Sequence, residues 1–253
     1  MGVFPSGREK LDILYADDDL VAINKPAGLL VHRSPIDRRE TRFALQLLRD
    51  QLGRLVYPAH RLDKPTSGVL LFALSPEMAR VLGESFARGA VEKTYLAVLR
   101  GVCDAEGVID YPLFEEPDRL ADYPAQPDKP DKPAQEAVTS FRRLGQVELP
   151  FAVGRYPSSR YSLVVAHPHT GRRHQLRRHF KHIFHPIIGD TKYGEGRHNR
   201  FFREHFGCQR LLLAATRLAL PHPLDGRPLV IEAPLDPAFA ELLERLGWLS
   251  LAP

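Results

Sequence analysis

The string HRLDKPTSG at residues 60–68 leads directly into the apolar run VLLFA at 69–73. Pro65 and Gly68 favour a turn, because proline fixes φ and glycine adopts conformations that other residues avoid. The apolar run has the length and composition of a strand buried on both faces. The string therefore predicts a polar loop around Asp63 held against a buried strand, a common place for catalytic groups. The alternative is an ordinary turn in which Asp63 only caps the backbone.

The overall composition is that of a globular protein. The 253 residues are 43% hydrophobic and 26% charged, enough to bury the core of one large domain or of two lobes. No run approaches the ~18 apolar residues that span a membrane, so no membrane partner is expected. The two cysteines, Cys103 and Cys208, are far apart in sequence, which favours unpaired thiols in a cytoplasmic protein.

Basic residues are concentrated in one stretch. Residues 167–210 contain ten lysines and arginines, three acids and eight of the 11 histidines. A stretch so one-sided favours a polyanionic partner such as RNA. The alternative is a solvated basic face without a ligand. A zinc site built from the histidines at 174, 179, 182 and 185 is disfavoured, because their spacing fits no usual zinc pattern.

The remaining pattern alternates short strands with helices. Strands are expected at 11–15, 20–23, 29–32, 69–73, 92–99, 137–144, 160–166 and 229–233. Helices are expected at 41–52, 76–88 and 236–246, capped by Thr41, Ser75 and Asp236. A further helix is expected before Pro186, with Leu176, Phe180, Ile183 and Phe184 on its apolar face. Residues 209–220 fit a helix or a strand.

A proline-rich segment interrupts this pattern. Residues 115–136 contain five prolines among charged residues, a density that neither a helix nor a central strand tolerates. We expect an extended surface loop there. It either is inert or contacts RNA.

Five strings in order resemble the motifs of the RluA-type pseudouridine synthases. They are NKPAG at 24–28, HRLDKPTSG at 60–68, KTY at 93–95, TGRRHQLRRH at 170–179 and HPIIGD at 185–190. The resemblance covers residues 11–235. It implies an α+β fold: a large mixed, mostly antiparallel sheet in two lobes, with flanking helices and a central basic cleft. One catalytic domain over 1–253 is expected, without the additional S4-type domain that some members carry.

The resemblance also assigns roles in the active site. Asp63 is implied as the catalytic carboxylate, Arg177 as its charge partner and Leu176 as the apolar support beneath it. Tyr95 is implied to stack on the target base, although a strand tyrosine is more often a core residue. Arg61 is expected to fill the space that a flipped base leaves.

Further contacts to RNA are expected from cationic side chains. The set comprises Lys25, His60, Arg61, Arg173 and Lys181. Arg173 and Lys181 are spaced four residues on either side of Arg177, which places all three on one helix face. The alternative for Lys25 is a solvated turn lysine.

The implied reaction isomerises a uridine in RNA to pseudouridine. It needs neither redox chemistry nor phosphate energy, so no cofactor and no metal are expected. Within the family, LLVHRS at 29–34, KPTSG at 64–68, GRYP at 154–157 and HQLRRH at 174–179 are similar to the branch that modifies uridine 65 of tRNA. We therefore expect tRNA as the binding partner. The protein is expected to be a monomer without a protein partner.

Other functions remain open at this point. Within the same family, ribosomal RNA or another tRNA position is an alternative target. A binding-only RNA protein would have the basic face without needing an acid at position 63. A hydrolase using His60 and Asp63 would need a nucleophile on a sharp turn between a strand and a helix. The Gly-x-Ser-x-Gly string typical of such a turn is not present.

Overall fold

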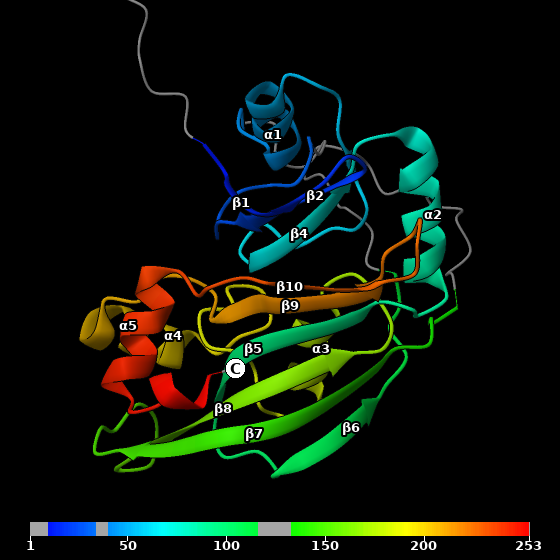
Figure 1. The fold of residues 1–253 in the computed structure, drawn as a ribbon. Helices are drawn as coiled ribbons and strands as arrows, with labels where there is room; N and C mark the ends of the chain where they lie inside the picture. Colours follow the sequence, from blue (N-terminus) through cyan, green and yellow to red (C-terminus); the bar gives the residue numbers. More distant parts are fainter. Residues whose placement is uncertain (1–9, 34–39, 116–132, 253) are drawn as a thin grey trace, which may run out of the picture.

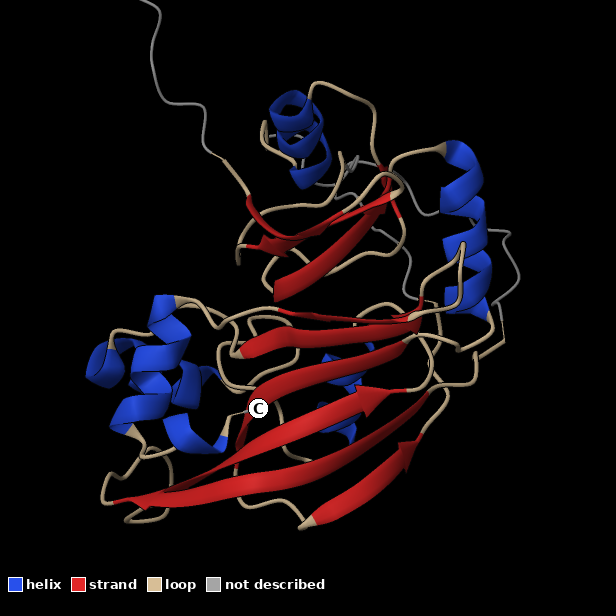
Figure 2. Ribbon diagram, viewed as in Figure 1, coloured by secondary structure: helices blue, strands red, loops and turns tan. Residues whose placement is uncertain are grey.

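The computed structural model describes residues 10–33, 40–115 and 133–252 and contains one ten-stranded sheet with flanking helices (Figures 1 and 2). The strands are β1 (Asp12–Ala16), β2 (Leu20–Lys25), β3 (Tyr57–Pro58), β4 (Ser67–Ala73), β5 (Glu92–Arg100), β6 (Glu106–Asp110), β7 (Val138–Leu149), β8 (Ser159–Pro168), β9 (Leu213–Pro221) and β10 (Pro228–Glu232). The helices are α1 (Ala44–Leu52), α2 (Pro76–Ala87), α3 (Gln175–His182), α4 (Gly196–Phe206) and α5 (Pro237–Arg245), followed by a 3₁₀ turn at Leu249–Leu251.

The sheet consists of a smaller half, β1 to β4, and a larger half, β5 to β10, whose strands pair with each other at one short junction. Its order is β1-β2-β4-β9-β5-β8-β7-β6, with β3 on β4 and β10 on β9. All pairings are antiparallel except β4 with β9, which is parallel and aligns only Ser67 with Ala214 and Gly68 with Ala215. Beyond these pairs β9 hydrogen-bonds to β10 instead, so β4 and β9 diverge (Figure 1). The predicted α+β fold is confirmed.

Helices cover both faces of the larger half because its central strands are apolar on both sides. In β5, Leu96 and Val98 pack in the same core as Phe202 of α4 and Phe239 of α5. The alternate residues of β5 pack with Leu176 and Phe180 of α3. In Figure 2, α4 and α5 accordingly lie at one end of the sheet, while α3 is seen behind it.

Two helix starts agree with the sequence prediction. Ser75 accepts a hydrogen bond from the Met78 amide at 3.1 Å and begins α2. Asp236 accepts one from the Phe239 amide at 3.2 Å and begins α5. In both cases proline occupies the first turn, where its missing N–H costs no helical hydrogen bond.

The start of α1 corrects two predictions. The backbone carbonyls of Leu30 and Val31 accept hydrogen bonds from the first amides of α1, at 2.8 and 3.0 Å. Thr41 is therefore not the cap, and Phe43 stands at that position without a side-chain cap. Residues 29–32 are not a strand, because two of their carbonyls accept hydrogen bonds from the amides of α1. Among these four residues, only Leu30 forms an isolated bridge, to Phe43.

Other elements differ from the prediction. Phe184 does not share the apolar face of α3: the helix ends at His182, and Phe184 is 80% exposed with a φ of 64°. Strand β6 and helix α4 were not predicted, and 209–220 is mostly the strand β9. Most of the expected loop at 115–136 lies outside the described residues. No helix within the described ranges is long and apolar enough to cross a membrane.

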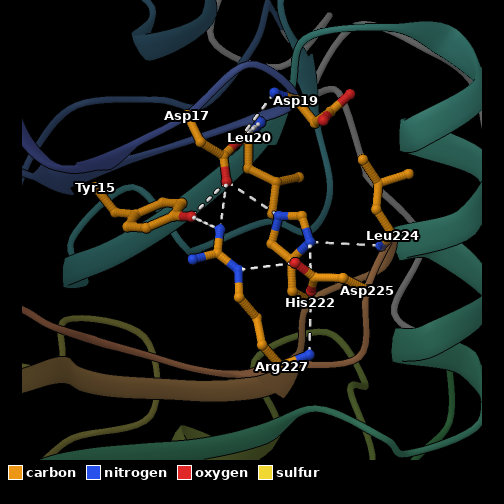
Figure 3. Close-up of polar contacts among 8 residues, drawn as sticks. All are labelled: Tyr15, Asp17, Asp19, Leu20, His222, Leu224, Asp225 and Arg227. Carbon is orange, nitrogen blue, oxygen red and sulfur yellow. Dashed lines mark hydrogen bonds and ion pairs between the residues drawn. The ribbon is translucent and has the colours of Figure 1, made fainter.

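A polar cluster joins the two halves at a second point (Figure 3). We call it the remote network: Tyr15, Asp17, His222, Asp225 and Arg227. Asp17, after β1, accepts hydrogen bonds from the Tyr15 hydroxyl and the amides of residues 19 and 20, and it contacts His222 Nε2 at 3.0 Å. Arg227, in the turn before β10, reaches both Tyr15 and Asp17. The β1–β2 turn is thus tied to the β9–β10 turn.

Candidate active site

The loop that carries Asp63 lies between β3 and β4, beside the junction of the two halves. The Thr66 amide donates to the Asp63 carbonyl at 3.0 Å and closes the turn. Gly68 follows with a φ of 112°, and a Cβ there would lie 2.0 Å from the Ala215 carbonyl oxygen. Only glycine allows this approach of β4 to β9. The predicted loop and buried strand are therefore present, and β4 is buried along its whole length.

Arg177 of α3 brings two carboxylates together. Its Nη1 donates to Oδ2 of Asp63 at 3.1 Å, while Nε and Nη2 bind Asp190 at 2.7 and 2.9 Å. We call Asp63, Arg177 and Asp190 the active-site network. Burial acts to lower the pKa of the Arg177 guanidinium, but Asp190 and Asp63 outweigh it and raise the pKa. The structure thus pairs Asp63 with Arg177 across the junction.

Asp190 is a member of this network that the motif analysis did not assign. Besides Arg177, its Oδ1 accepts the amides of Lys192 and Tyr193, each at 2.9 Å. Burial acts to raise the pKa of Asp190, but these hydrogen bonds outweigh it and lower the pKa. Asp190 therefore stays ionised and orients Arg177. Its position as the single acid between residues 167 and 194 was the available sequence signal.

His174 and Tyr193 complete the surroundings of Asp63. Nδ1 of His174 lies 2.8 Å from the Tyr193 hydroxyl, and Nε2 lies 3.8 Å from Oδ1 of Asp63. Tyr193 is buried beneath Arg177, whose Cζ lies 5.1 Å from the ring centroid. From the sequence, His174 was counted among the histidines of the basic stretch and disfavoured as a zinc ligand, and Tyr193 was assigned no role.

Lys25 is placed differently from the prediction. Its side chain is fully buried, and Nζ donates to the carbonyls of Pro26, Leu29 and Lys64 at 2.9, 2.8 and 3.2 Å. Burial lowers the pKa of Lys25 to about 7, although the nearby Asp63 charge opposes this shift. An ammonium enclosed by three carbonyls has no surface for a phosphate. The expected RNA contact is therefore corrected to a structural role, since Lys25 ties the Asp63 loop to β2.

His60 also has a different environment from that of a phosphate-binding cation. Its Nε2 accepts the Leu71 amide at 3.1 Å, and its ring stacks on Phe86 at 4.9 Å between centroids. Burial, and then the charge of Lys93, lower the pKa of His60 to about 4. The ring is therefore neutral near pH 7 and supports the pocket wall. Arg61, the next residue, is exposed and lines the same pocket.

Tyr95 and Leu176 form apolar parts of the pocket. Tyr95 of β5 is partly buried against the cores of both halves, and its ring lines the pocket near Asp63. Burial, together with the negative charge of Asp63, raises the pKa of the Tyr95 hydroxyl, so the phenol stays protonated. Leu176 is 5% exposed and lines the pocket beside Arg177. Both residues thus line the pocket, and their implied roles remain predictions.

The predicted shared face of Arg173, Arg177 and Lys181 is only partly correct. Arg173 precedes α3, because His174 adopts a left-handed conformation with φ 54° and begins the helix. Arg173 lines the pocket, whereas Arg177 is buried. Lys181 is exposed, and its Nζ lies 5.9 Å from the Tyr193 ring that Arg177 also covers. Arg173 and Lys181 therefore remain candidates for RNA contacts at separate points.

The pocket itself has a volume of about 560 Å³, a size typical of small-molecule sites. Its charged lining comprises Arg61, Asp63, Lys93, Arg172, Arg173 and Arg177. Among the described residues that line it, Asp63 is the one acid. A single carboxylate in a cationic pocket, with an aromatic ring beside it, is suited to act on the nucleotide of a polyanion.

The four histidines of the zinc alternative contact other groups of the protein. His179 contacts Thr139 and the Tyr111 carbonyl, and His185 contacts the Arg100 carbonyl. His182 stacks on Tyr111. In the described part of the chain, no group of three or more histidine, cysteine or acidic side chains is placed to hold a metal ion.

Comparison with known proteins identifies the class. The family model described as RNA pseudouridylate synthase matches residues 19–182. The chain therefore belongs to the RNA pseudouridylate synthase family, and its enzyme class is that of an RNA pseudouridine synthase. The resemblance to the RluA-type enzymes is confirmed.

Individual relatives are similar over almost the whole chain. The tRNA pseudouridine synthase C of Vibrio cholerae is 54% identical over 238 residues, which cover 94% of this chain and 96% of that protein. The protein of the same name from Haemophilus ducreyi is 54% identical over 239 residues, 94% and 97% of the two chains. Human RNA pseudouridylate synthase domain containing 4 has a similar structure, with a TM-score of 0.69, 30% identity and 93% coverage of each chain.

Proposed function

We propose that the protein converts uridine 65 of tRNA to pseudouridine. The observation that carries this proposal is the position of Asp63, the one acid that the described part of the chain contributes to the lining of a cationic pocket, paired at 3.1 Å with a buried arginine. The preference for tRNA is supported by the relatives that are more than half identical and named tRNA pseudouridine synthase C. A ribosomal RNA target and another tRNA position are the competing proposals.

The chemistry breaks the C1′–N1 bond of uridine, rotates the uracil and joins C5 to C1′. C5 loses its proton and N1 gains one, so the reaction needs no oxidant and no energy source. Asp63 attacks C1′, attacks C6 or abstracts a sugar proton, and each route requires an ionised carboxylate. The Arg177 guanidinium stabilises that negative charge, and Asp190 holds the guanidinium in place.

Base flipping is the second requirement, because the reacting carbons are inaccessible in a stacked stem. Tyr95 offers a ring on which the extruded uracil stacks, and Arg61 is exposed at the pocket, where it can fill the vacated space. Arg173 and Lys181 are proposed to contact backbone phosphates. These roles together account for binding without a cofactor.

We also propose that the chain acts as a single catalytic domain and as a monomer without a protein partner. Both halves of the sheet contribute to one pocket: Asp63 comes from the β3–β4 loop and Arg177 from α3. A cytoplasmic site of action belongs to the same proposal, since tRNA is the substrate.

The test is to map pseudouridines in total RNA from cells with and without the gene. Loss of one pseudouridine, at position 65 of tRNA, is expected. A matched pair of transcripts, tRNA with uridine or with cytidine at 65, then tests the position with purified protein. Modification of ribosomal RNA alone, or equal modification of both transcripts, would refute the position. Binding of tRNA with no pseudouridine formed in any RNA would indicate a binding-only protein.

A further inference from the structure

The backbone at His174 is unusual for a residue with a side chain. Its φ of 54° and ψ of 26° are left-handed, at the residue that precedes α3. A residue at this position commonly caps the helix with its side chain, yet His174 makes no such hydrogen bond. Left-handed residues that are not glycine often mark functional sites. Here the backbone turns the imidazole away from the helix and toward Asp63.

Both ring nitrogens of His174 face polar atoms. Nδ1 lies 2.8 Å from the Tyr193 hydroxyl, and Nε2 lies 3.8 Å from Oδ1 of Asp63. The side chain is 14% exposed. Tyr193 is itself fixed by its amide, which donates to Asp190. The imidazole is therefore held by the same network that holds Arg177.

The charge and tautomer of the ring follow from its neighbours. Burial, reinforced by the cations of Arg177, Arg173 and Lys192 against the opposing Asp63, lowers the pKa of His174 to about 4. The ring is thus neutral near pH 7 and carries one proton. A proton on Nδ1 would turn the Nε2 lone pair toward the Asp63 carboxylate, which is repulsive. A proton on Nε2, with Nδ1 accepting from the Tyr193 hydroxyl, is favoured.

We infer that His174 is a positioning residue for Asp63, acting through an Nε2–H group directed at Oδ1 while Arg177 binds Oδ2. The two donors together fix the plane of the carboxylate relative to the pocket. At 3.8 Å the contact is longer than a hydrogen bond, and catalytic hydrogen bonds commonly tighten when substrate binds. The inference rests on the proposed function, and it adds a group beyond the aspartate, arginine and tyrosine already discussed.

Two substitutions separate positioning from a structural role. His174→Asn accepts the left-handed backbone and keeps a polar atom near the place of Nδ1, but it offers no donor at the place of Nε2. His174→Gln is longer and can present an amide N–H near that second place. A residue that only holds Tyr193 would be replaced better by Asn. A residue that positions Asp63 would be replaced better by Gln.

The experiment measures tritium release from tRNA transcribed with 5-tritiated uridine, at saturating tRNA and across pH, with melting temperatures as a control. For His174→Asn we expect a saturated rate ~10- to 100-fold below wild type, with KM within about threefold. For His174→Gln we expect recovery to within about fivefold of wild type. In the Asn variant the acid limb of the pH–rate profile moves to higher pH, because the carboxylate has lost a donor.

A normal rate and unmoved acid limb in His174→Asn would overturn the inference, as would equal losses in the two variants. If either variant melts below the assay temperature, Tyr193→Phe replaces it. That change keeps the ring under Arg177 but frees the imidazole to change tautomer, and a rate ~3- to 10-fold lower at unchanged KM is expected; an unchanged rate would count against the inference. Failure of the proposed function is distinct: the wild-type protein would then release no tritium.

Discussion

Two polar networks join the halves of the sheet, and each contains a carboxylate from the smaller half. In the remote network, Asp17 makes five polar contacts, to two backbone amides and to Tyr15, His222 and Arg227. In the active-site network, Asp63 accepts one side-chain hydrogen bond, from Arg177, within the described chain. The two side chains are almost equally exposed, 23% for Asp17 and 17% for Asp63.

Exposure therefore does not distinguish the reactive carboxylate from the structural one. The difference lies in unused hydrogen-bonding capacity. An ionised carboxylate offers about four lone-pair sites; in Asp17 these are occupied, whereas in Asp63 most remain directed to a pocket. Asp190 resembles Asp17, since its oxygens are bound by Arg177 and two amides. The comparison predicts large catalytic effects at Asp63 and mainly effects on stability at Asp17.

Asp63→Asn is expected to produce the largest effect. An amide can neither act as a nucleophile nor accept a proton, so pseudouridine formation should fall by roughly three orders of magnitude or more. Affinity for tRNA should stay within a few-fold, because the carboxylate contributes nothing to phosphate binding. Nucleoside analysis gives the rate and filter binding gives the affinity. Residual turnover near that of wild type would contradict the role of Asp63.

Arg177→Ala should rank second, and it should affect both catalysis and stability. The saturated rate should fall roughly 100-fold, as expected when a preorganised electrostatic partner is lost. Asp190 would be left buried without its cation, which costs about 3–5 kcal/mol of unfolding free energy. Single-turnover kinetics and urea unfolding measure the two effects, with Arg177→Lys as the control that keeps a charge. A fall in affinity with an intact saturated rate would make Arg177 a phosphate contact instead.

Substitutions of Tyr95 test the stacking role at the pocket. Tyr95→Phe keeps the ring and should retain much of the binding and rate. Tyr95→Ala should lose about 1–3 kcal/mol of tRNA binding free energy, the usual contribution of stacking one base, and should also lose rate. Affinity and single-turnover rate are measured for both. If the two variants behave alike, Tyr95 is a core residue or a proton carrier.

Asp17→Asn should lower the free energy of unfolding by about 1.5–3 kcal/mol, the usual contribution of hydrogen bonds to a charged group. Burial acts to raise the pKa of Asp17, but its hydrogen bonds, beginning with that from Tyr15, outweigh it and lower the pKa. A lowered native pKa stabilises the fold above the unfolded pKa of about 3.9 and loses that stabilisation as the pH falls through the native value. The difference in unfolding free energy between wild type and variant should therefore be constant above about pH 5 and shrink in stronger acid. Urea unfolding across pH measures it; a difference that grows in acid would have the wrong sign.

Arg173→Ala and Lys181→Ala should produce the smallest effects. Each should weaken binding of any tRNA and reduce the log–log salt slope by roughly one unit, because one phosphate contact and its released counterions are lost. Arg49→Ala is the matched control, since Arg49 carries the same charge on α1 and does not line the pocket. Equal salt slopes of tRNA affinity in all three variants would exclude specific phosphate contacts at Arg173 and Lys181.

The fold class and the pairing of Asp63 with Arg177 could be predicted from the sequence, because the strings around these two residues are specific in combination. The sequence did not reveal that Lys25 is enclosed by carbonyls from three residues, since that depends on how two loops meet in space. Arg173 was wrongly predicted to lie on the helix face of Arg177, because no local pattern indicated the left-handed turn at His174. Asp190 was quoted within a motif, yet its contacts with Arg177, and those of Tyr193 with His174, arise only from tertiary packing.

The most direct test places Asp63→Asn and Asp17→Asn side by side with wild type. Each protein, in excess over tRNA transcribed with 5-tritiated uridine, is followed for tritium release in a single turnover, at a pH where all three are folded. The catalytic role of Asp63 predicts release of one equivalent at the same rate from wild type and Asp17→Asn, and none from Asp63→Asn. Release by Asp63→Asn, or an Asp17→Asn protein as inactive as Asp63→Asn while still folded, would contradict it.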